Sequence, residues 1–223
     1  MKWLSLGSPK SPFEVRILMG LHKLTNCFES NLMINWFQMI IIGITGTIGA
    51  GKGTIVGYLT SKKGFKHFSA RAFLVEEIEK RGLENNRDNL VIVGNDLRLK
   101  HGSSYVADEL YRRALVSGDN CIIESLRTVG EIESLKSKGS FILFAVDADP
   151  RIRFERILDR KAVTDNVSFD KFLEDEKREM ESNDPNKQNL KKCIEMADFV
   201  IDNNGTLDEL NLKIEEILKI IKI

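Results

Sequence analysis

The sequence predicts an α/β protein in which helices cover both faces of a five-stranded parallel sheet. From residue 39 onward, short apolar runs alternate with stretches of helical periodicity, as expected for parallel strands joined by crossover helices. Three of the runs are almost continuous in Ile, Val, Leu and Phe, which is typical of strands buried on both faces. The expected strands are 39–44, 65–68, 120–125, 141–147 and 198–202.

Helical patterns fill the intervals between these runs. Glycines at 64, 118 and 139 stand where three of the helices should end. In a sheet of this kind ligands bind outside the carboxyl ends of the strands, so candidate site residues are sought there. The expected helices are 52–63, 70–81, 87–116, 129–138, 150–160, 168–182, 186–196 and 206–222.

Composition narrows the class of protein. The 223 residues include 33 basic and 33 acidic side chains, so the formal charge gives no argument for a nucleic acid polymer or an anionic membrane as partner. No run approaches the roughly 18 apolar residues that a membrane-spanning helix needs. The three scattered cysteines suit a reducing compartment. We expect a cytoplasmic protein that binds neither nucleic acid polymers nor membranes.

Residues 1–38 differ from the rest of the chain. They contain both tryptophans but only six of the charged residues. We expect them to form an N-terminal extension outside the core domain, which would then comprise residues 39–223. The alternative is an N-terminal helix that covers part of the core.

A glycine-rich segment, GTIGAGKGT at 46–54, follows the first expected strand and precedes the first expected helix. Its Gly-x4-Gly-Lys spacing in this context is typical of a phosphate-binding loop. Glycines allow backbone amides to converge on an anion, and the helix N-terminus adds a partial positive charge. The alternative is a tight turn whose glycines serve packing only. The expected ATP-binding residues are Gly46, Thr47, Ile48, Gly49, Ala50, Gly51, Lys52, Gly53 and Thr54.

The residue after Lys52 departs from the usual loop pattern. A hydroxyl next to the lysine normally ligates Mg²⁺, and Gly53 has none. We therefore expect the Mg²⁺ that accompanies ATP to be held mainly by water, nucleotide phosphates and a carboxylate. Glycine and threonine after the lysine resemble nucleoside monophosphate kinases more than GTPases or motor ATPases.

Two charged residues follow the third expected strand, in CIIESLRT. Glu124 at the strand end is placed to orient the water shell of Mg²⁺, which makes it the candidate metal residue. Arg127, three residues later, is suited to bind an acceptor phosphate through two N–H groups. The alternative is a strand-end glutamate that pairs with a neighbouring base on a solvated turn.

The helix expected at 150–160 carries a row of arginines. Arg153, Arg156 and Arg160 share one helical face by their spacing. Cationic side chains stabilise the charge that develops on a transferring phosphoryl group. We expect residues 150–165 to form a short lid, with Arg156 and Arg160 acting in catalysis beside Lys52, Arg127 and Glu124. The alternative is a solvated helix face.

The stretch between the second and third strands is far longer than a crossover needs. We expect residues 69–117 to form a helical insertion that binds the second substrate. Its candidate acceptor-binding residues are Ser69, Arg71, Arg98 and Tyr105, which would act together with Arg127 after the third strand. Each of the four is equally well explained as an ordinary surface residue.

Six segments carry a resemblance to a known family: GITGTIGAGKGT (43–54), EKRGLE (79–84), DLRLKHG (96–102), IIESLRT (122–128), RFERILDR (153–160) and ADFVIDNNGTLDEL (197–210). Together they resemble the P-loop nucleoside monophosphate kinase superfamily over about residues 39 to 220. The likeness is greatest to dephospho-coenzyme A kinase and to archaeal proteins related to adenylate kinase. It implies that the loop after the last strand, with Asn203, Asn204 and Gly205, packs near the adenine of ATP.

Residues 69–75 bear on the acceptor. Dephospho-coenzyme A kinases usually carry an aspartate in this region, suited to accept a proton from a sugar hydroxyl, and here there is none. A phosphate acceptor needs no strong base. We therefore expect an ATP-dependent kinase acting on a nucleoside or deoxynucleoside monophosphate. The alternatives are a dephospho-coenzyme A kinase, a nucleotide-binding switch or ATPase without a small-molecule acceptor, and a structural protein that uses the loop only as a turn.

Overall fold

The computed structural model describes residues 39–160 and 168–223, and within them the predicted fold class is confirmed. Five parallel strands lie side by side in the order β2-β3-β1-β4-β5. The expected extension at 1–38 and residues 161–165 of the expected lid lie outside the described residues. The strands are β1 Ile41–Gly46, β2 Lys66–Ser69, β3 Cys121–Glu124, β4 Phe141–Asp147 and β5 Phe199–Asp202.

Helices occupy every connection between the strands. The helix expected at 87–116 is two helices, because the chain turns at Gly102, whose φ is 106°. In the part of the chain that is described, no helix combines the length and apolarity needed to cross a membrane. The helices are α3 Lys52–Lys63, α4 Ala70–Lys80, α5 Arg87–His101, α6 Tyr105–Ser117, α7 Val129–Lys136, α8 Pro150–Arg160, α9 Phe169–Met180, α10 Leu190–Glu195 and α11 Leu207–Ile220.

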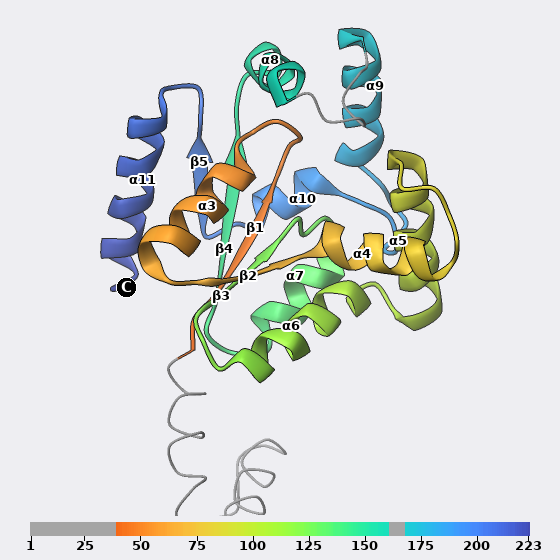
Figure 1. Ribbon diagram of the computed structural model, residues 1–223, viewed down its shortest axis with the longest axis horizontal. Coiled ribbons are helices and arrows are strands. Elements are labelled where there is room, and N and C mark those ends of the chain that lie inside the picture. Colours follow the sequence, from red (N-terminus) through yellow and green to blue (C-terminus); the bar gives the residue numbers. More distant parts are fainter. Residues whose placement is uncertain (1–38, 161–167) are drawn as a thin grey trace, which may run out of the picture. The chain divides into compact units, whose positions relative to one another are not determined.

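Helices cover both faces of the sheet (Figure 1). α3 and α11 lie on one face, and α6, α7 and α10 lie on the other. The side chains of β1 alternate accordingly: Ile42 and Ile44 belong to the core under α3 and α11, whereas Ile41 belongs to the core under α6 and α7. Burial on both faces explains why a strand such as β1 has an almost uninterrupted apolar sequence.

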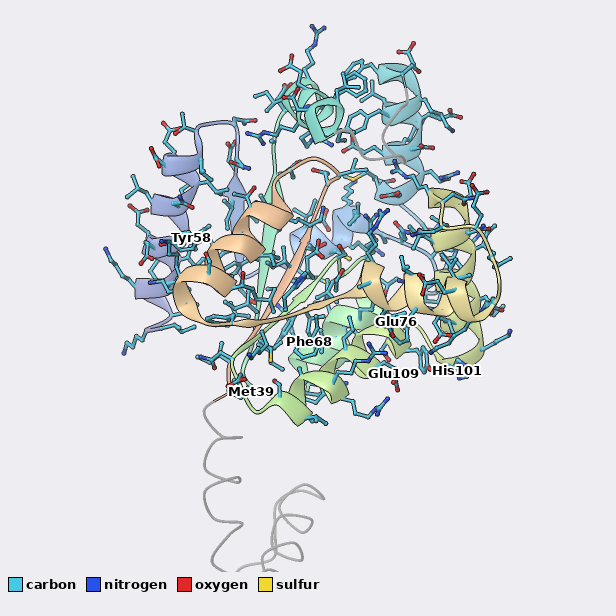
Figure 2. All side chains as sticks on the ribbon, in the orientation of Figure 1. Met39, Tyr58, Phe68, Glu76, His101 and Glu109 are labelled. Carbon is cyan, nitrogen blue, oxygen red and sulfur yellow. The ribbon has the colours of Figure 1, made fainter. Side chains whose placement is uncertain are left out.

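Polar side chains join α3 to α11 at the surface. Tyr58 lies between the two helices (Figure 2), and its hydroxyl donates a hydrogen bond to Glu215. Lys63 pairs with the same carboxylate at 2.8 Å. Exposed pairs contribute at most about 1 kcal/mol each, so burial of the apolar faces supplies most of the packing free energy.

The carboxyl ends of the strands meet at one edge of the sheet. The register pairs Glu124 of β3 with Ile44 of β1 on one side and with Ser69 of β2 on the other. On the opposite flank, Asp147 of β4 pairs with Asp202 of β5. The sheet thus brings together the loop after β1 and the polar residues that end its neighbours, at the edge where such sheets bind ligands.

Candidate active site

Three glycines give the loop between β1 and α3 its shape. Gly46, Gly49 and Gly51 have φ of 133°, 78° and 103°, values that residues with a side chain rarely adopt. Space is restricted as well: a Cβ on Gly46 would lie 2.0 Å from the carbonyl oxygen of Val146, and one on Gly51 would lie 2.3 Å from Nδ2 of Asn203. The backbone conformation of the loop therefore depends on glycine at these positions.

Lys52 begins α3, and its side chain bends back over the loop. Its Nζ donates hydrogen bonds to the carbonyl oxygens of Gly46, at 2.9 Å, and Thr47, at 2.7 Å. These bonds hold the ammonium group against the loop backbone. Gly53 and Thr54 are exposed on the first turn of α3, and a Cβ on Gly53 would meet no atom within 4 Å.

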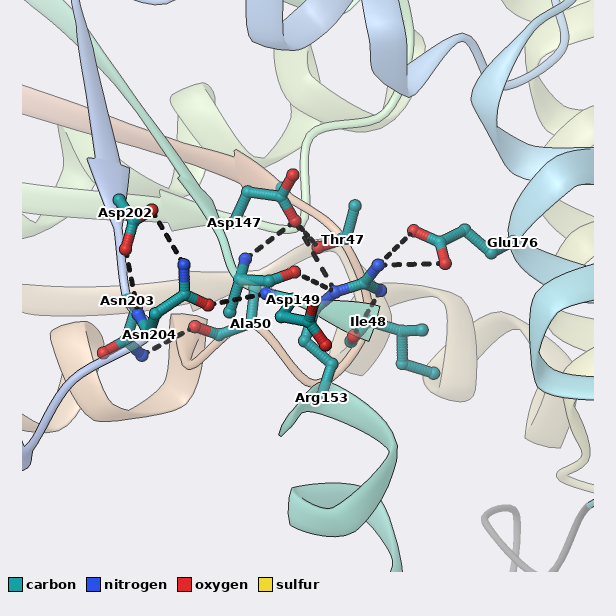
Figure 3. A network of polar contacts seen from close by, with 12 residues as sticks. Thr47, Ile48, Ala50, Asp147, Asp149, Arg153, Glu176, Asp202, Asn203 and Asn204 are labelled. Atoms are coloured by element: carbon teal, nitrogen blue, oxygen red, sulfur yellow. Dashed lines mark hydrogen bonds and ion pairs between the residues drawn. The ribbon is translucent and has the colours of Figure 1, made fainter. Parts of the chain in front are cut away.

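Side chains from the strand ends fasten the loop from outside (Figure 3). Thr47 is buried and donates a hydrogen bond from Oγ1 to Oδ1 of Asp147 at 2.5 Å. Asn203, buried after β5, donates from Nδ2 to the carbonyl oxygen of Ala50 at 2.8 Å. Contacts from Asp147 at the end of β4 and from Asn203 after β5 therefore stabilise the loop conformation that its glycines permit.

Arg153 on α8 fastens the loop to α9. Its side chain is only 3% exposed, and its Nη1 donates to the carbonyl oxygen of Ile48 at 3.2 Å. Its Nε donates a hydrogen bond to the carbonyl oxygen of Ala148 at 2.7 Å. Its Nη2 lies 2.8 Å from a carboxylate oxygen of Glu176, and the guanidinium lies over the ring of Phe172. Arg153, one of the three arginines expected on one face of this helix, therefore contacts the backbone of the loop and stabilises it.

The other two arginines of the predicted row differ in position. Arg156 makes a long hydrogen bond of 3.5 Å from Nη2 to the carbonyl oxygen of Gly205. Its Nη1 is buried and has no hydrogen-bond partner among the described residues. The side chain of Arg160 lies outside the described part of the chain. The residues predicted near adenine, Asn203 and Gly205, thus contact the loop and Arg156 respectively.

Glu124 ends β3 beside the loop. Its carboxylate accepts hydrogen bonds from Ser69, at 3.2 Å, and Ser125, at 2.7 Å, and lies 3.6 Å from Nε2 of His67. Burial alone would raise the pKa of Glu124, but the contacts with His67 and Ser125 and the charge of Lys52 outweigh it and lower the pKa to about 2. The carboxylate is therefore ionised at neutral pH and available to organise a hydrated cation.

A pocket adjoins the loop on the side of α4 and α5. Its polar lining is rich in arginine, and its apolar lining comes from α4, α5 and the loop itself. Ile48 belongs to both the loop and the pocket, so the two sites share a residue. The lining residues are Ile48, Ala70, Arg71, Leu74, Arg87, Leu90, Val91, Arg98, Ser125, Arg127, Glu179 and Gln188.

Arg127, the residue expected to bind an acceptor phosphate, lines this pocket and contacts α9. Its Nη1 pairs with Glu179 and also donates to Oε1 of Gln188 at 2.9 Å. Glu179 pairs in addition with Arg87 at 2.8 Å. Two arginines and a glutamate from three separate elements thus meet at the wall of the pocket.

The remaining candidates for the acceptor side lie in different surroundings. Ser69 caps α4 and contacts Glu124, and Arg71 lines the pocket. Arg98 also lines the pocket, but its guanidinium is 3% exposed and pairs with Glu131, which is fully buried. Tyr105 is not among the lining residues; its ring stacks on His101 with 4.4 Å between ring centroids.

Several residues of the site were missed by reasoning from the sequence. Asp147 carries a usable signal, because it ends an apolar strand on the edge where ligands bind. His67 joins Glu124 only through the pairing of β2 with β3. Arg87 and Glu179 lie far from Arg127 along the chain and offer no local signal, because tertiary packing alone brings them together.

Solved structures share this fold. A sugar kinase from Janibacter superposes with a TM-score of 0.52 at 19% identity, covering 83% of this chain and 95% of the other. A shikimate kinase from Bacteroides thetaiotaomicron gives a TM-score of 0.51 at 16% identity, covering 81% and 99%. The sheet, the glycine-rich loop and these neighbours define an α/β P-loop fold, the fold class predicted from the sequence.

Relatives specify the family more narrowly. A family model described as an AAA domain matches residues 42–184. A UPF0200 protein from Thermococcus kodakarensis is 31% identical over 186 residues, covering 81% of this chain and 96% of the relative. A UPF0200/UPF0201 protein from Archaeoglobus fulgidus is 30% identical over 186 residues, and this chain spans 55% of its length. The chain belongs to the AAA domain family and to the UPF0200 family.

Proposed function

We propose that the protein is an ATP-dependent phosphotransferase that moves the γ-phosphoryl group to a nucleotide-like acceptor, a nucleoside or deoxynucleoside monophosphate. The observation that carries the proposal is the shared wall between loop and pocket. Ile48 belongs to the phosphate loop and also lines the arginine-rich pocket. A donor phosphate on the loop and an acceptor phosphate in the pocket would therefore be neighbours, as direct transfer requires.

On the donor side, the loop amides and Lys52 bind the β- and γ-phosphates of ATP. The ammonium group, which in the described structure contacts the carbonyls of Gly46 and Thr47, turns to the phosphates when the nucleotide binds. Arg156, which contacts Gly205 and whose Nη1 has no hydrogen-bond partner within residues 39–160 and 168–223, contributes positive charge from α8. These groups position the phosphoryl group and stabilise the charge that develops on it.

Magnesium belongs to this proposal as the companion of ATP. In the described part of the chain, no group of three or more His, Cys, Asp or Glu side chains could hold a metal ion. The ionised carboxylate of Glu124 fits a role through the water shell, with the nucleotide phosphates as the direct ligands. The ion, when bound, neutralises charge on the transferring phosphates.

On the acceptor side, Arg127 lines the pocket from the loop after β3, and Arg71 lines it from α4. Apolar side chains such as Leu74 and Leu90 line the same pocket, so it combines a surface for a base or ring with guanidinium groups for a phosphate. Arg98 holds Glu131 and thereby helps to shape the wall. A nucleoside monophosphate combines the two kinds of surface that this lining recognises.

The test is a product assay with the full-length protein, ATP and Mg²⁺. The acceptors are all ribo- and deoxynucleoside monophosphates, with dephospho-coenzyme A and shikimate as hydroxyl acceptors. We expect a phosphorylated nucleotide to appear with at least one monophosphate. Lys52→Ala should abolish its formation, while the matched variant Lys62→Ala, at the other end of the same helix, should not. Transfer retained in Lys52→Ala would overturn the mechanism, and transfer only to a hydroxyl acceptor would overturn the assigned acceptor class.

A further inference from the structure

Glu179 occupies a position between two arginines of the pocket. One carboxylate oxygen contacts Nη1 of Arg127, and the other accepts a hydrogen bond from Nη2 of Arg87 at 2.8 Å. The Glu179 side chain is only 6% exposed. Both of its oxygens are thus engaged by guanidinium groups inside the pocket that we assign to the acceptor.

The surroundings of Glu179 have the chemistry of an oxyanion site. Guanidinium groups present pairs of N–H donors that match a carboxylate or a phosphate equally well. Four arginines line the pocket, and Glu179 is the one carboxylate among its lining residues. One of the four, Arg98, is already paired with Glu131, which does not line the pocket. A phosphate that binds beside Arg127 and Arg87 would compete with Glu179 for their N–H donors.

Glu179 is fully able to compete as an anion. Burial alone would raise the pKa of Glu179, but the charges of Arg127 and Arg87 and their hydrogen bonds outweigh it and lower the pKa to about 2. The carboxylate therefore stays charged at neutral pH.

The Glu179 side chain also lies where it can move away from the two arginines without unfolding α9. It is the next-to-last residue of α9, and the chain after Met180 is extended. Other contacts attach α9 to its neighbours independently of Glu179: Glu176 pairs with Arg153, Phe172 packs against Phe154, and Arg178 lies 3.7 Å from Asp88 of α5. Rotation of the Glu179 side chain would release the N–H groups that it now holds, while Arg127 keeps its hydrogen bond to Gln188 and Arg87 keeps its pairing with Asp175 at 3.7 Å.

We propose that Glu179 is an internal competitor for the anionic group of the acceptor, which binds by displacing this carboxylate from Arg127 and Arg87. The inference rests on the proposed function, because it concerns the same pocket. The apparent affinity for the acceptor equals the intrinsic affinity multiplied by the fraction of time that the arginines are not held by Glu179. Glu179 thus limits binding to ligands whose anionic group binds the two arginines tightly enough to displace the carboxylate.

The test uses the full-length protein with the phosphate loop filled by AMP-PNP and Mg²⁺, so that added phosphate cannot bind there. Isothermal titration calorimetry first measures AMP-PNP binding and then the dissociation constant of inorganic phosphate. Glu179→Gln keeps the shape of the side chain and removes its charge, and we expect it to bind phosphate roughly tenfold more tightly. Arg87→Gln should bind phosphate several-fold more weakly. Glu181→Gln, which loses an exposed pair with Lys191, should behave as the wild type.

The outcomes separate the two proposals. Failure of AMP-PNP to bind to the wild type would overturn the proposed function and this inference with it. With AMP-PNP bound, phosphate affinity that is unchanged or weaker in folded Glu179→Gln would overturn the inference alone. Circular dichroism reports whether each variant is folded. If Glu179→Gln does not fold, Arg87→Gln decides, since unchanged phosphate binding in that variant would also overturn the inference.

Discussion

Nη1 of Arg153 donates a hydrogen bond of 3.2 Å to the carbonyl oxygen of Ile48, and so joins α8 to the phosphate loop. Ile48 also lines the pocket next to the loop. The same guanidinium pairs with Glu176 on α9, the helix that carries Glu179. A single buried arginine therefore contacts the loop and the helix that borders the pocket, and its removal should affect both stability and binding.

Replacing Arg153 by methionine should be strongly destabilising. The variant leaves Glu176 without its buried partner and frees the carbonyl oxygen of Ile48. Loss of one partner of a buried ion pair costs about 3–5 kcal/mol, and Glu176 is mostly buried, so we expect a loss of about 3 kcal/mol in the free energy of unfolding. Urea unfolding measures it, with the exposed Arg151→Met as control. A loss below about 1 kcal/mol would contradict the assigned role.

Gly51 and Gly57 should respond oppositely to alanine. Gly51→Ala forces a side chain into a φ of 103° and against Asn203, so nucleotide binding should fall at least tenfold. Gly57 lies inside α3, is exposed, and has nothing within 4 Å of an added Cβ. Gly57→Ala should raise the free energy of unfolding by about 0.5–1 kcal/mol without changing nucleotide binding. Calorimetry with AMP-PNP and urea unfolding test the pair, and unimpaired binding in Gly51→Ala would refute the loop geometry.

Arg98 and Glu131 should be strongly coupled. Nε and Nη2 of Arg98 donate to Oε1 of Glu131, at 3.1 and 2.9 Å, and both side chains are almost completely buried. Arg98→Met alone leaves a buried carboxylate without its counter-ion and should cost about 3–5 kcal/mol. The double variant with Glu131→Leu should lose clearly less than the sum of the two single losses. A double-mutant cycle from urea unfolding measures the difference, and losses that add within about 0.5 kcal/mol would show that the pair is not coupled.

Glu124 should make the free energy of unfolding depend on pH in the acid range. The pKa of Glu124 is lowered to about 2 from an ordinary value of 4.5, so folding favours the charged form. The resulting stabilisation is complete above about pH 5 and is lost as the pH falls through 4.5 toward 2. Glu124→Gln should therefore cost roughly 3 kcal/mol at pH 7 but only about 1 kcal/mol at pH 3. Urea unfolding at both values tests this, with exposed Glu216→Gln as control. A cost independent of pH would contradict the assigned environment.

Features with a local signal could be predicted from the sequence. The three central strands, β1, β3 and β4, are largely buried, so their apolar runs mark them directly, and the glycine spacing marks the loop after β1. The break between α5 and α6 was missed because Gly102 interrupts an otherwise continuous helical pattern. A lone glycine in such a pattern is compatible with either outcome, and tertiary packing decides.

The partners of the site residues could not be predicted in the same way. Helical spacing placed Arg153 and Arg156 on one face, but it contained no information on which neighbour that face would meet. Arg153 turned out to be buried against Ile48 and Glu176, residues that lie far away in the sequence. Likewise Arg127 was recognised by its place after a strand, whereas its partner Glu179 follows from the packing of α9. The catalytic and binding roles assigned to these residues remain predictions.

The most direct test of the central claim is the stoichiometry of ATP consumption by the full-length protein. ADP and phosphorylated acceptor are quantified together by chromatography, with Mg²⁺ and each nucleoside monophosphate in turn. The account predicts that the correct monophosphate accelerates ADP formation and that one phosphorylated acceptor appears for each ADP. Both products should be lost in Lys52→Ala and strongly reduced in Arg127→Ala. ADP released at the same rate with every acceptor and with none, as free phosphate, would contradict it and would indicate an ATPase.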